Sequence, residues 1–117
     1  MARRKRKQKQ ILWQEEGTCY LCALFGDNSW KFTHGHHIYP GANRRISEQE
    51  GFVCRLCLQH HTEGPEAVHN NITNMRIIQR AAQREYEKTH TREEFMALIG
   101  RSYLDDESNT VFEKEGK

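Results

Sequence analysis

The pattern of apolar and polar residues divides the chain into a strand-forming half followed by a helical half. Large apolar and polar side chains alternate over residues 30–34, which predicts a half-buried strand that continues until Pro40 and Gly41 end it. A second short strand is predicted over 52–57. The residues between the two strands, 41–51, have the composition of a polar loop.

The second half of the chain is predicted to be helical. Apolar residues within 73–89 follow an approximate helical stripe, which predicts a long helix. Thr91 and Glu94 match a capping box, so a second helix is predicted to begin there and to end near Gly100. A short helix is also predicted over 11–16, before the first cysteine.

Length and composition indicate one small domain between two polar ends. The 117 residues are enough for one domain, and 36% of them are hydrophobic. We expect residues 1–10 to form a flexible basic arm, residues 105–117 a disordered acidic tail, and residues 11–104 a single α+β domain. A core of this size commonly depends on a metal or a disulfide for stability.

Charge and hydropathy indicate the partner and the compartment. The net charge is only +2, but a run of basic residues at the N-terminus suits a polyanionic partner such as DNA. No apolar run approaches the roughly 18 residues of a membrane span, and no apolar signal core follows the basic run. We therefore expect a cytoplasmic protein with no membrane partner, in which cysteines bind metal. The basic run consists of Arg3, Arg4, Lys5, Arg6, Lys7 and Lys9.

Four cysteines form two CxxC pairs, Cys19/Cys22 and Cys54/Cys57. Pairs at this spacing can bind one structural Zn²⁺ tetrahedrally through four ligands. The sequence Cys57-x-x-His60 is also a ligand pair, and on a strand Cys54 and Cys57 would point to opposite faces. We therefore favour Cys19, Cys22, Cys57 and His60 as the zinc ligands, with Cys54 in place of His60 as the alternative.

Histidines concentrate at the ends of the two predicted strands. Imidazole binds transition metals and can act as a base near neutral pH. Phosphodiester hydrolysis needs both a cation and a base. Because adjacent residues of an extended segment point to opposite sides, one of His36 and His37 can face a metal while the other faces the attacking water. The histidines at these strand ends are His34, His36, His37, His60 and His61, and His69 follows eight residues after His61.

The motifs together resemble the HNH endonucleases, whose fold is the ββα-metal or His-Me finger. The resemblance covers about residues 17–75, with a weaker fit through Leu104, and implies a ββα-metal core with a zinc knuckle and C-terminal helices. It implies that His37 is the general base, and that His36 and His61 ligate a catalytic metal. The matching motifs are CxxC at 19–22, His-His-Ile-x-Pro at 36–40 and Leu-Cys-x-x-His-His at 56–61.

The stretch 36–45 followed by Ser47 and Glu48, together with Ala67-Val68-His69-Asn70-Asn71, is similar to small HNH-like proteins of phages and prophages, akin to phage recombination-enhancing nucleases. This similarity implies that His69 is a third ligand, and that a recombination or phage packaging protein is a partner. Mg²⁺ prefers oxygen ligands, so at this histidine-rich site Mn²⁺, Ni²⁺ or Zn²⁺ would fit as well as Mg²⁺. Phe52 stands where the family has an Asn that orients the base, and Asn43, Asn70 and Asn71 are candidates to replace that residue.

The sequence thus predicts a metal-dependent endonuclease that hydrolyses phosphodiester bonds in DNA. Arg44 and Arg45, together with the arm, are expected to contact phosphates. We expect Trp13, Trp30 and Phe32 to belong to the core rather than to stack on bases. Two alternatives remain: a non-catalytic zinc-dependent nucleic-acid-binding module, and a structural zinc protein that binds another protein. A metalloprotease is not expected, because the chain has no His-Glu-x-x-His helix.

Overall fold

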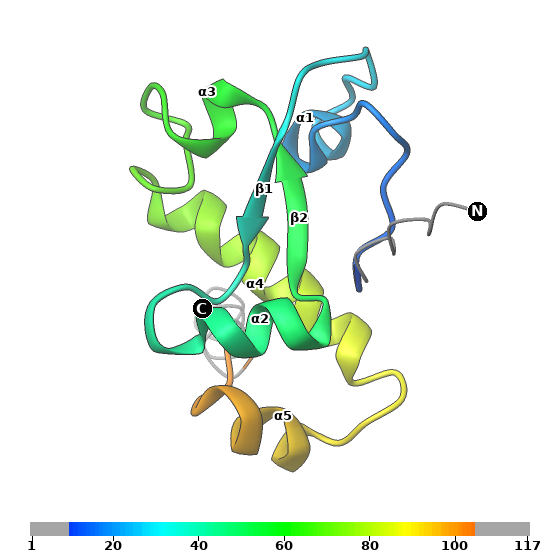
Figure 1. Ribbon diagram of the computed structural model, residues 1–117, viewed down its shortest axis with the longest axis vertical. Helices are drawn as coiled ribbons and strands as arrows, with labels where there is room; N and C mark the ends of the chain where they lie inside the picture. Colours follow the sequence, from blue (N-terminus) through cyan, green and yellow to red (C-terminus); the bar gives the residue numbers. More distant parts are fainter. Residues whose placement is uncertain (1–9, 105–117) are drawn as a thin grey trace, which may run out of the picture.

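The computed structural model describes residues 10–104 and has a mixed α/β fold, in which helices surround a two-stranded sheet (Figure 1). Residues 1–9 and 105–117 lie outside the described part, and with them nearly all of the predicted arm and the whole predicted tail. Within residues 10–104, no helix has the length and apolar character needed to cross a membrane.

The sheet is an antiparallel hairpin of β1 (His34–His37) and β2 (Val53–Leu56). His36 lies opposite Cys54, so the two share one face of the hairpin, whereas His37 lies on the other face. The second strand was predicted closely. The first begins at His34, four residues later than the alternation at residues 30–34 predicted.

The segment that joins the strands is helical, and the prediction of a polar loop over 41–51 is wrong. It contains η1 (Gly41–Asn43) and α2 (Arg44–Glu50). The buried Ser47 fixes this helix to the hairpin: its hydroxyl donates to the Tyr39 carbonyl at 2.8 Å and accepts from the Tyr39 N–H at 3.1 Å. The helix has too few apolar residues to show a stripe.

Two short helices follow the cysteine motifs at the same end of the hairpin (Figure 1). They are α1 (Tyr20–Leu24), whose N-cap is Cys19, and α3 (Leu58–His61), whose N-cap is Cys57. The helix predicted over 11–16 is absent. That segment is irregular and is attached by its backbone, since the N–H of Ile11 donates to Gly51 at 2.8 Å.

The two later helices were predicted correctly as α4 (Ile72–Tyr86) and α5 (Arg92–Ile99). The capping box is present: the Thr91 hydroxyl accepts from the Glu94 N–H at 3.0 Å, and the Glu94 carboxylate accepts from the Thr91 N–H at 2.8 Å. Figure 1 shows α4 running behind the hairpin and α5 at the far end from α1 and α3.

A cluster of buried aromatic rings joins α4, α5 and the hairpin. Tyr39 meets Phe52 at 5.1 Å and Phe95 at 5.5 Å between ring centroids, and Phe52 meets Tyr86 at 5.7 Å. Aromatic contacts of this kind add to the stabilisation from burial. They fix the end of the hairpin where β1 stops and β2 begins.

Three other aromatic residues are exposed, so the expectation that they belong to the core is wrong. Trp13 is 81% exposed, Trp30 64% and Phe32 84%. They lie on irregular segments before β1, whereas Tyr39, Phe52 and other rings fill the interior. The alternation of Trp30 and Phe32 with polar residues therefore does not reflect one buried face of a strand.

Candidate metal centres

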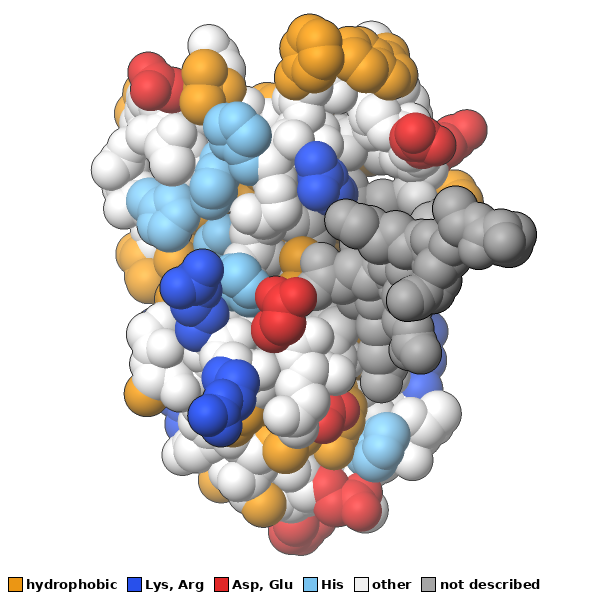
Figure 2. All heavy atoms as spheres, viewed as in Figure 1, with side chains coloured by type: hydrophobic (Ala, Val, Ile, Leu, Met, Phe, Trp, Pro, Cys, Tyr) orange, Lys and Arg blue, Asp and Glu red, His pale blue; other side chains and the backbone are white. Residues whose placement is uncertain are grey.

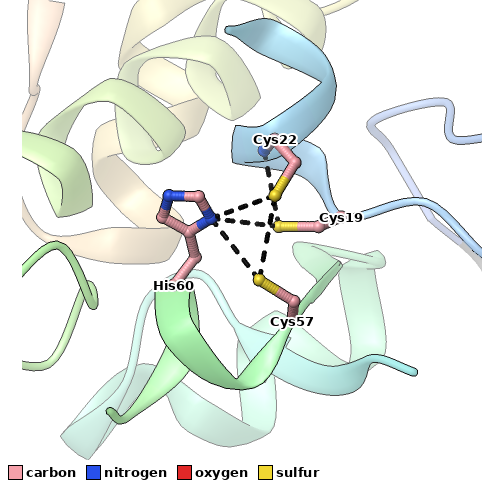
Figure 3. A group of neighbouring side chains, drawn as sticks. All are labelled: Cys19, Cys22, Cys57 and His60. Carbon is pink, nitrogen blue, oxygen red and sulfur yellow. Dashed lines mark hydrogen bonds between the residues drawn. The ribbon is translucent and has the colours of Figure 1, made fainter. Parts of the chain in front are cut away.

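Four side chains converge where α1 meets α3 (Figure 3). Cys19 and Cys22 come from the start of α1, and Cys57 and His60 from the start of α3. Each pair is separated by three residues, which places both side chains on one side of a helical first turn. The three cysteines are buried and His60 is half-buried, so together the four residues form a candidate metal site consistent with a structural ion such as zinc.

The distances within this group fit a tetrahedral ion. Zinc bonds of about 2.3 Å to sulfur and 2.0–2.1 Å to nitrogen place two sulfurs roughly 3.8 Å apart, and a sulfur and a nitrogen roughly 3.6 Å apart. The sulfurs of Cys22 and Cys57 are 3.8 Å apart. The Nδ1 atom of His60 lies 3.5 Å from the sulfur of Cys19, 3.4 Å from that of Cys22 and 3.5 Å from that of Cys57.

Electrostatics give this group a strong preference for a cation or for protons. Burial, together with the neighbouring Cys19 and Cys57 thiols, raises the pKa of Cys22 to about 12. Several thiolates this close therefore require a bound cation to balance their charge. Metal binding at this site should release protons.

Cys54 does not belong to the group. It lies on β2 opposite His36, is fully buried, and packs in the hydrophobic core. Burial raises the pKa of its thiol, so it remains neutral there. The alternation of side chains along β2 directs Cys54 into the core, while Cys57, after the strand has ended, lies at the start of α3.

A second group consists of His36, His61 and His69. One nitrogen from each lies within 4.8 Å of the others. His36 is contributed by β1, His61 by the last turn of α3, and His69 by the turn before α4. Their exposure increases in that order: His36 is buried, His61 is half-buried and His69 is exposed. The group therefore opens to solvent on one side.

The second group is suited to bind a cation by its lone pairs. Burial, with the adjacent His61 and His69, lowers the pKa of His36 to about 3. Burial and the neighbouring imidazoles also lower the pKa of His61. Both rings are thus neutral near pH 7 and carry one unprotonated nitrogen each, as metal ligands must. Three imidazole nitrogens are the donor set of a known class of open metal site.

His34 lies beside the second group, although the sequence assigned no role to it. Its Nδ1 is 3.4 Å from the Nδ1 of His61, and the ring centroids are 5.5 Å apart. His34 and His36 are two residues apart on β1 and so share a face, which is the signal that could have included His34. It is exposed and lies at the outer side of the group.

His37 lies apart from the three ligands and contacts a carboxylate. Its Nε2–H donates to the Glu48 carboxylate at 2.7 Å. Glu48 lies on α2, the helix that the sequence did not predict, so this contact was missed. Because a carboxylate only accepts, this contact uses the Nε2–H of His37, and Nδ1 is the ring nitrogen that does not contact Glu48.

The asparagines proposed to replace the missing family Asn have other partners. Asn43 donates to the Ile99 carbonyl at 2.9 Å, Asn70 donates to the Gly64 carbonyl at 2.9 Å, and Asn71 caps α4. Phe52 itself is fully buried in the aromatic core. Within the described residues, the hydrogen bond that orients His37 comes from Glu48 instead.

Basic side chains flank the histidines. Arg44 and Arg45 begin α2, the helix that carries Glu48, and both are exposed. Figure 2 shows a group of histidine side chains on one face, with basic side chains beside them. The predicted contacts of the arm residues lie outside the described part of the chain.

Comparison with known proteins does not identify a relative. No protein-family model matches the chain, and neither a curated protein nor a solved structure matches it. Any functional assignment must therefore come from the chemistry of the two groups of side chains.

Proposed function

We propose that this protein is a metal-dependent endonuclease of the HNH type, which hydrolyses phosphodiester bonds in DNA. One observation carries the proposal: a carboxylate-bound histidine, His37, directly follows His36 in the sequence, and His36 belongs to a group of three histidines that can hold a cation. The contact of His37 with Glu48 supplies a base of defined orientation. His36, the next residue on β1, belongs to the three-histidine group.

In this proposal His37 removes a proton from the attacking water. Its Nε2–H remains bonded to Glu48 at 2.7 Å, so Nδ1 accepts the proton. Glu48 also stabilises the positive charge that His37 then carries, as a carboxylate does beside a catalytic histidine. His36 and His37 point to opposite sides of β1, which separates the ligand from the base.

His36, His61 and His69 would hold the catalytic cation. A divalent ion bound there would stabilise the charge that develops on the phosphate and on the leaving 3′ oxygen. All-imidazole donors favour Mn²⁺, Ni²⁺ or Zn²⁺, and Mg²⁺ would depend on added water and phosphate oxygens. The first group would hold a structural Zn²⁺. In the proposed ββα-metal core, β1 and β2 are the strands and α3 supplies His61.

The exposed arginines support a nucleic-acid substrate. Arg44 and Arg45 stand on the same helix as Glu48, so a phosphate bound to them would lie near the proposed base. Such contacts give affinity that depends on salt but not on sequence. From the family resemblance, the proposal also includes an origin in a phage or prophage. It further includes a partner protein that acts in recombination or packaging.

A nicking assay tests the proposal. Wild type and His37→Ala would be freed of loosely bound metal, supplied with Mg²⁺ or Mn²⁺, and incubated with supercoiled plasmid. Nicking that needs added metal and falls at least about 100-fold in His37→Ala is expected from loss of a general base. Zinc content and melting temperature serve as controls, and His90→Ala is the matched histidine variant.

Two results would contradict the proposal. Equal nicking by wild type and His37→Ala would exclude His37 as the base. Absence of nicking by both, with salt-dependent DNA binding retained, would favour the non-catalytic binding module, for which the replacement of the family Asn by Phe52 is the supporting observation.

A further inference from the structure

An exposed aromatic pair lies on the segment that leads into β1. The rings of Trp30 and Phe32 meet edge to face with their centroids 4.7 Å apart, yet the residues are 64% and 84% exposed. Leaving such large apolar groups in water forgoes the stabilisation that burial would give. Grouped exposed apolar side chains commonly mark a binding site, and neither ring belongs to the proposed catalytic residues.

The backbone holds this pair in place. The N–H of Lys31 donates to the Gly17 carbonyl at 2.8 Å. The Trp30 indole packs directly on Gly17, so that a Cβ there would overlap the ring, and the φ of +83° at Gly17 also favours glycine. Asp27 fixes the preceding turn by accepting from Ser29 at 3.0 Å. A platform ordered in advance loses little entropy when a ligand binds.

A cavity adjoins the platform above the Cys/His group. Its volume is about 550 Å³, and the side chains of Phe32 and Leu58 form apolar parts of its lining. That volume lies in the range of small-ligand sites, roughly 300–1,000 Å³. The charged residues that line it are Asp27, Lys31, Glu63 and Glu66. Lys31 is paired with Asp27 at 3.0 Å, so the lining is acidic on balance and disfavours a phosphate. Carboxylates can instead accept from the N–H groups of a base, such as the ring N–H of thymine, and the cavity therefore suits bases rather than phosphates.

The platform is continuous with the histidine site. Phe32 precedes His34 by two residues, so their Cα atoms are at most about 7 Å apart. This distance corresponds to about two nucleotides of a stacked strand, at roughly 3.4 Å each. The exposed Arg55 side chain donates to the Thr33 hydroxyl at 3.0 Å, which places a cation between the platform and β1. Figure 2 shows exposed hydrophobic side chains at the end of the molecule near the histidines.

We infer that Trp30 and Phe32 stack on unpaired bases, so that the substrate contains a single-stranded segment beside the cleaved bond. In a duplex the faces of the bases are already stacked on one another, whereas an unpaired strand offers free faces to aromatic side chains. The inference deepens the proposed nuclease function and rests on it for the placement of the phosphates. Arg55 would contact the phosphate that precedes the stacked base.

Binding can be measured separately from cleavage. In His37→Ala, Trp13→Phe leaves Trp30 as the single tryptophan, because the chain has two. Its fluorescence would be followed during titration with a thymidine strand of about 12 nucleotides, a length within known single-strand site sizes. A strand of equal length without bases and a duplex of equal length are the comparison ligands. Phe32→Ala tests the platform, and Met96→Ala on α5 is the matched exposed control.

We expect the thymidine strand to quench Trp30 and to bind more tightly than the strand without bases. Phe32→Ala should lower the affinity only for the base-containing strand, by about 10-fold, which is the effect of losing one stacked base. Equal affinity for strands with and without bases, or no effect of Phe32→Ala, would overturn the inference and leave the pair as a protein-binding surface. A positive result here, with no metal-dependent cleavage of the plasmid or of the same thymidine strand by protein that retains His37, would retain the platform and reject the nuclease.

Discussion

The two groups of metal-binding side chains differ in whether they are closed. The first has three cysteines and His60, is largely buried, and offers four donors at tetrahedral spacing. The second has three histidines, from the buried His36 to the exposed His69. An ion with four protein ligands has no position for a substrate, whereas an ion with three retains one.

The groups also differ in how the chain builds them. The first joins two local turns, in which each ligand pair is three residues apart at the start of a short helix. The second joins a strand, the end of a helix and a turn, so only packing sets its geometry. The comparison assigns stability to the first group and, in our proposal, chemistry to the second.

The largest effect should come from removing a ligand of the first group. Structural zinc binding contributes on the order of 10 kcal/mol to folding, comparable with the whole stability of a small domain. Cys57→Ser should therefore lose zinc and lack a cooperative thermal transition. Zinc content and circular dichroism would measure both.

Cys54→Ala is the matched control for this first prediction, because Cys54 is fully buried but lies outside the group. It should retain one equivalent of zinc and lose only about 1 kcal/mol, as is usual for a small core truncation. If the Cys57→Ser protein still folds and binds zinc, the first group does not stabilise the fold in the way that distinguishes it from the second group.

A smaller structural effect but a large functional one is expected for the second group. His61→Ala removes a half-buried ligand, so Mn²⁺ affinity should fall by more than about 100-fold, a larger loss than changes around metal ligands usually cause. Zinc content should not change, and the melting temperature should remain within a few degrees. Calorimetric titration with Mn²⁺ measures the affinity.

His90→Ala is the control for His61→Ala, because His90 stacks on Tyr86 with centroids 4.1 Å apart and belongs to neither group. It should bind Mn²⁺ like wild type. An unchanged Mn²⁺ affinity in His61→Ala would mean that the three histidines do not act as one site.

The smallest effect should follow from changing the partner of His37. Glu48→Gln keeps a hydrogen-bond acceptor but removes the charge, so kcat should fall by about 10–100-fold, with little change in KM or Mn²⁺ affinity. Glu50→Gln on the same helix is the control. A loss of metal affinity in Glu48→Gln would show that Glu48 supports the ligands rather than the base.

Local patterns allowed good prediction of some elements and poor prediction of others. The capping box of α5 and the stripe of α4 depend on neighbours in the sequence, so they were found. The helix α2 was missed because Ser47, whose contacts with Tyr39 fix it, gives no hydrophobic signal. Gly51, in a left-handed conformation at the end of α2, was the available indication.

The sequence by itself determined the pairing of Cys19 with Cys22, because a spacing of three residues within one turn fixes their proximity. It favoured His60 over Cys54 as the partner of Cys57, and the tertiary structure decided between them by placing Cys54 in the core. For His69 the sequence offered only a resemblance, and the tertiary structure placed it beside His36. Only the tertiary structure decided that Glu48 reaches His37, because these contacts depend on how separate elements pack. The exposure of the aromatic pair was likewise decided by packing, since other rings had already filled the small core.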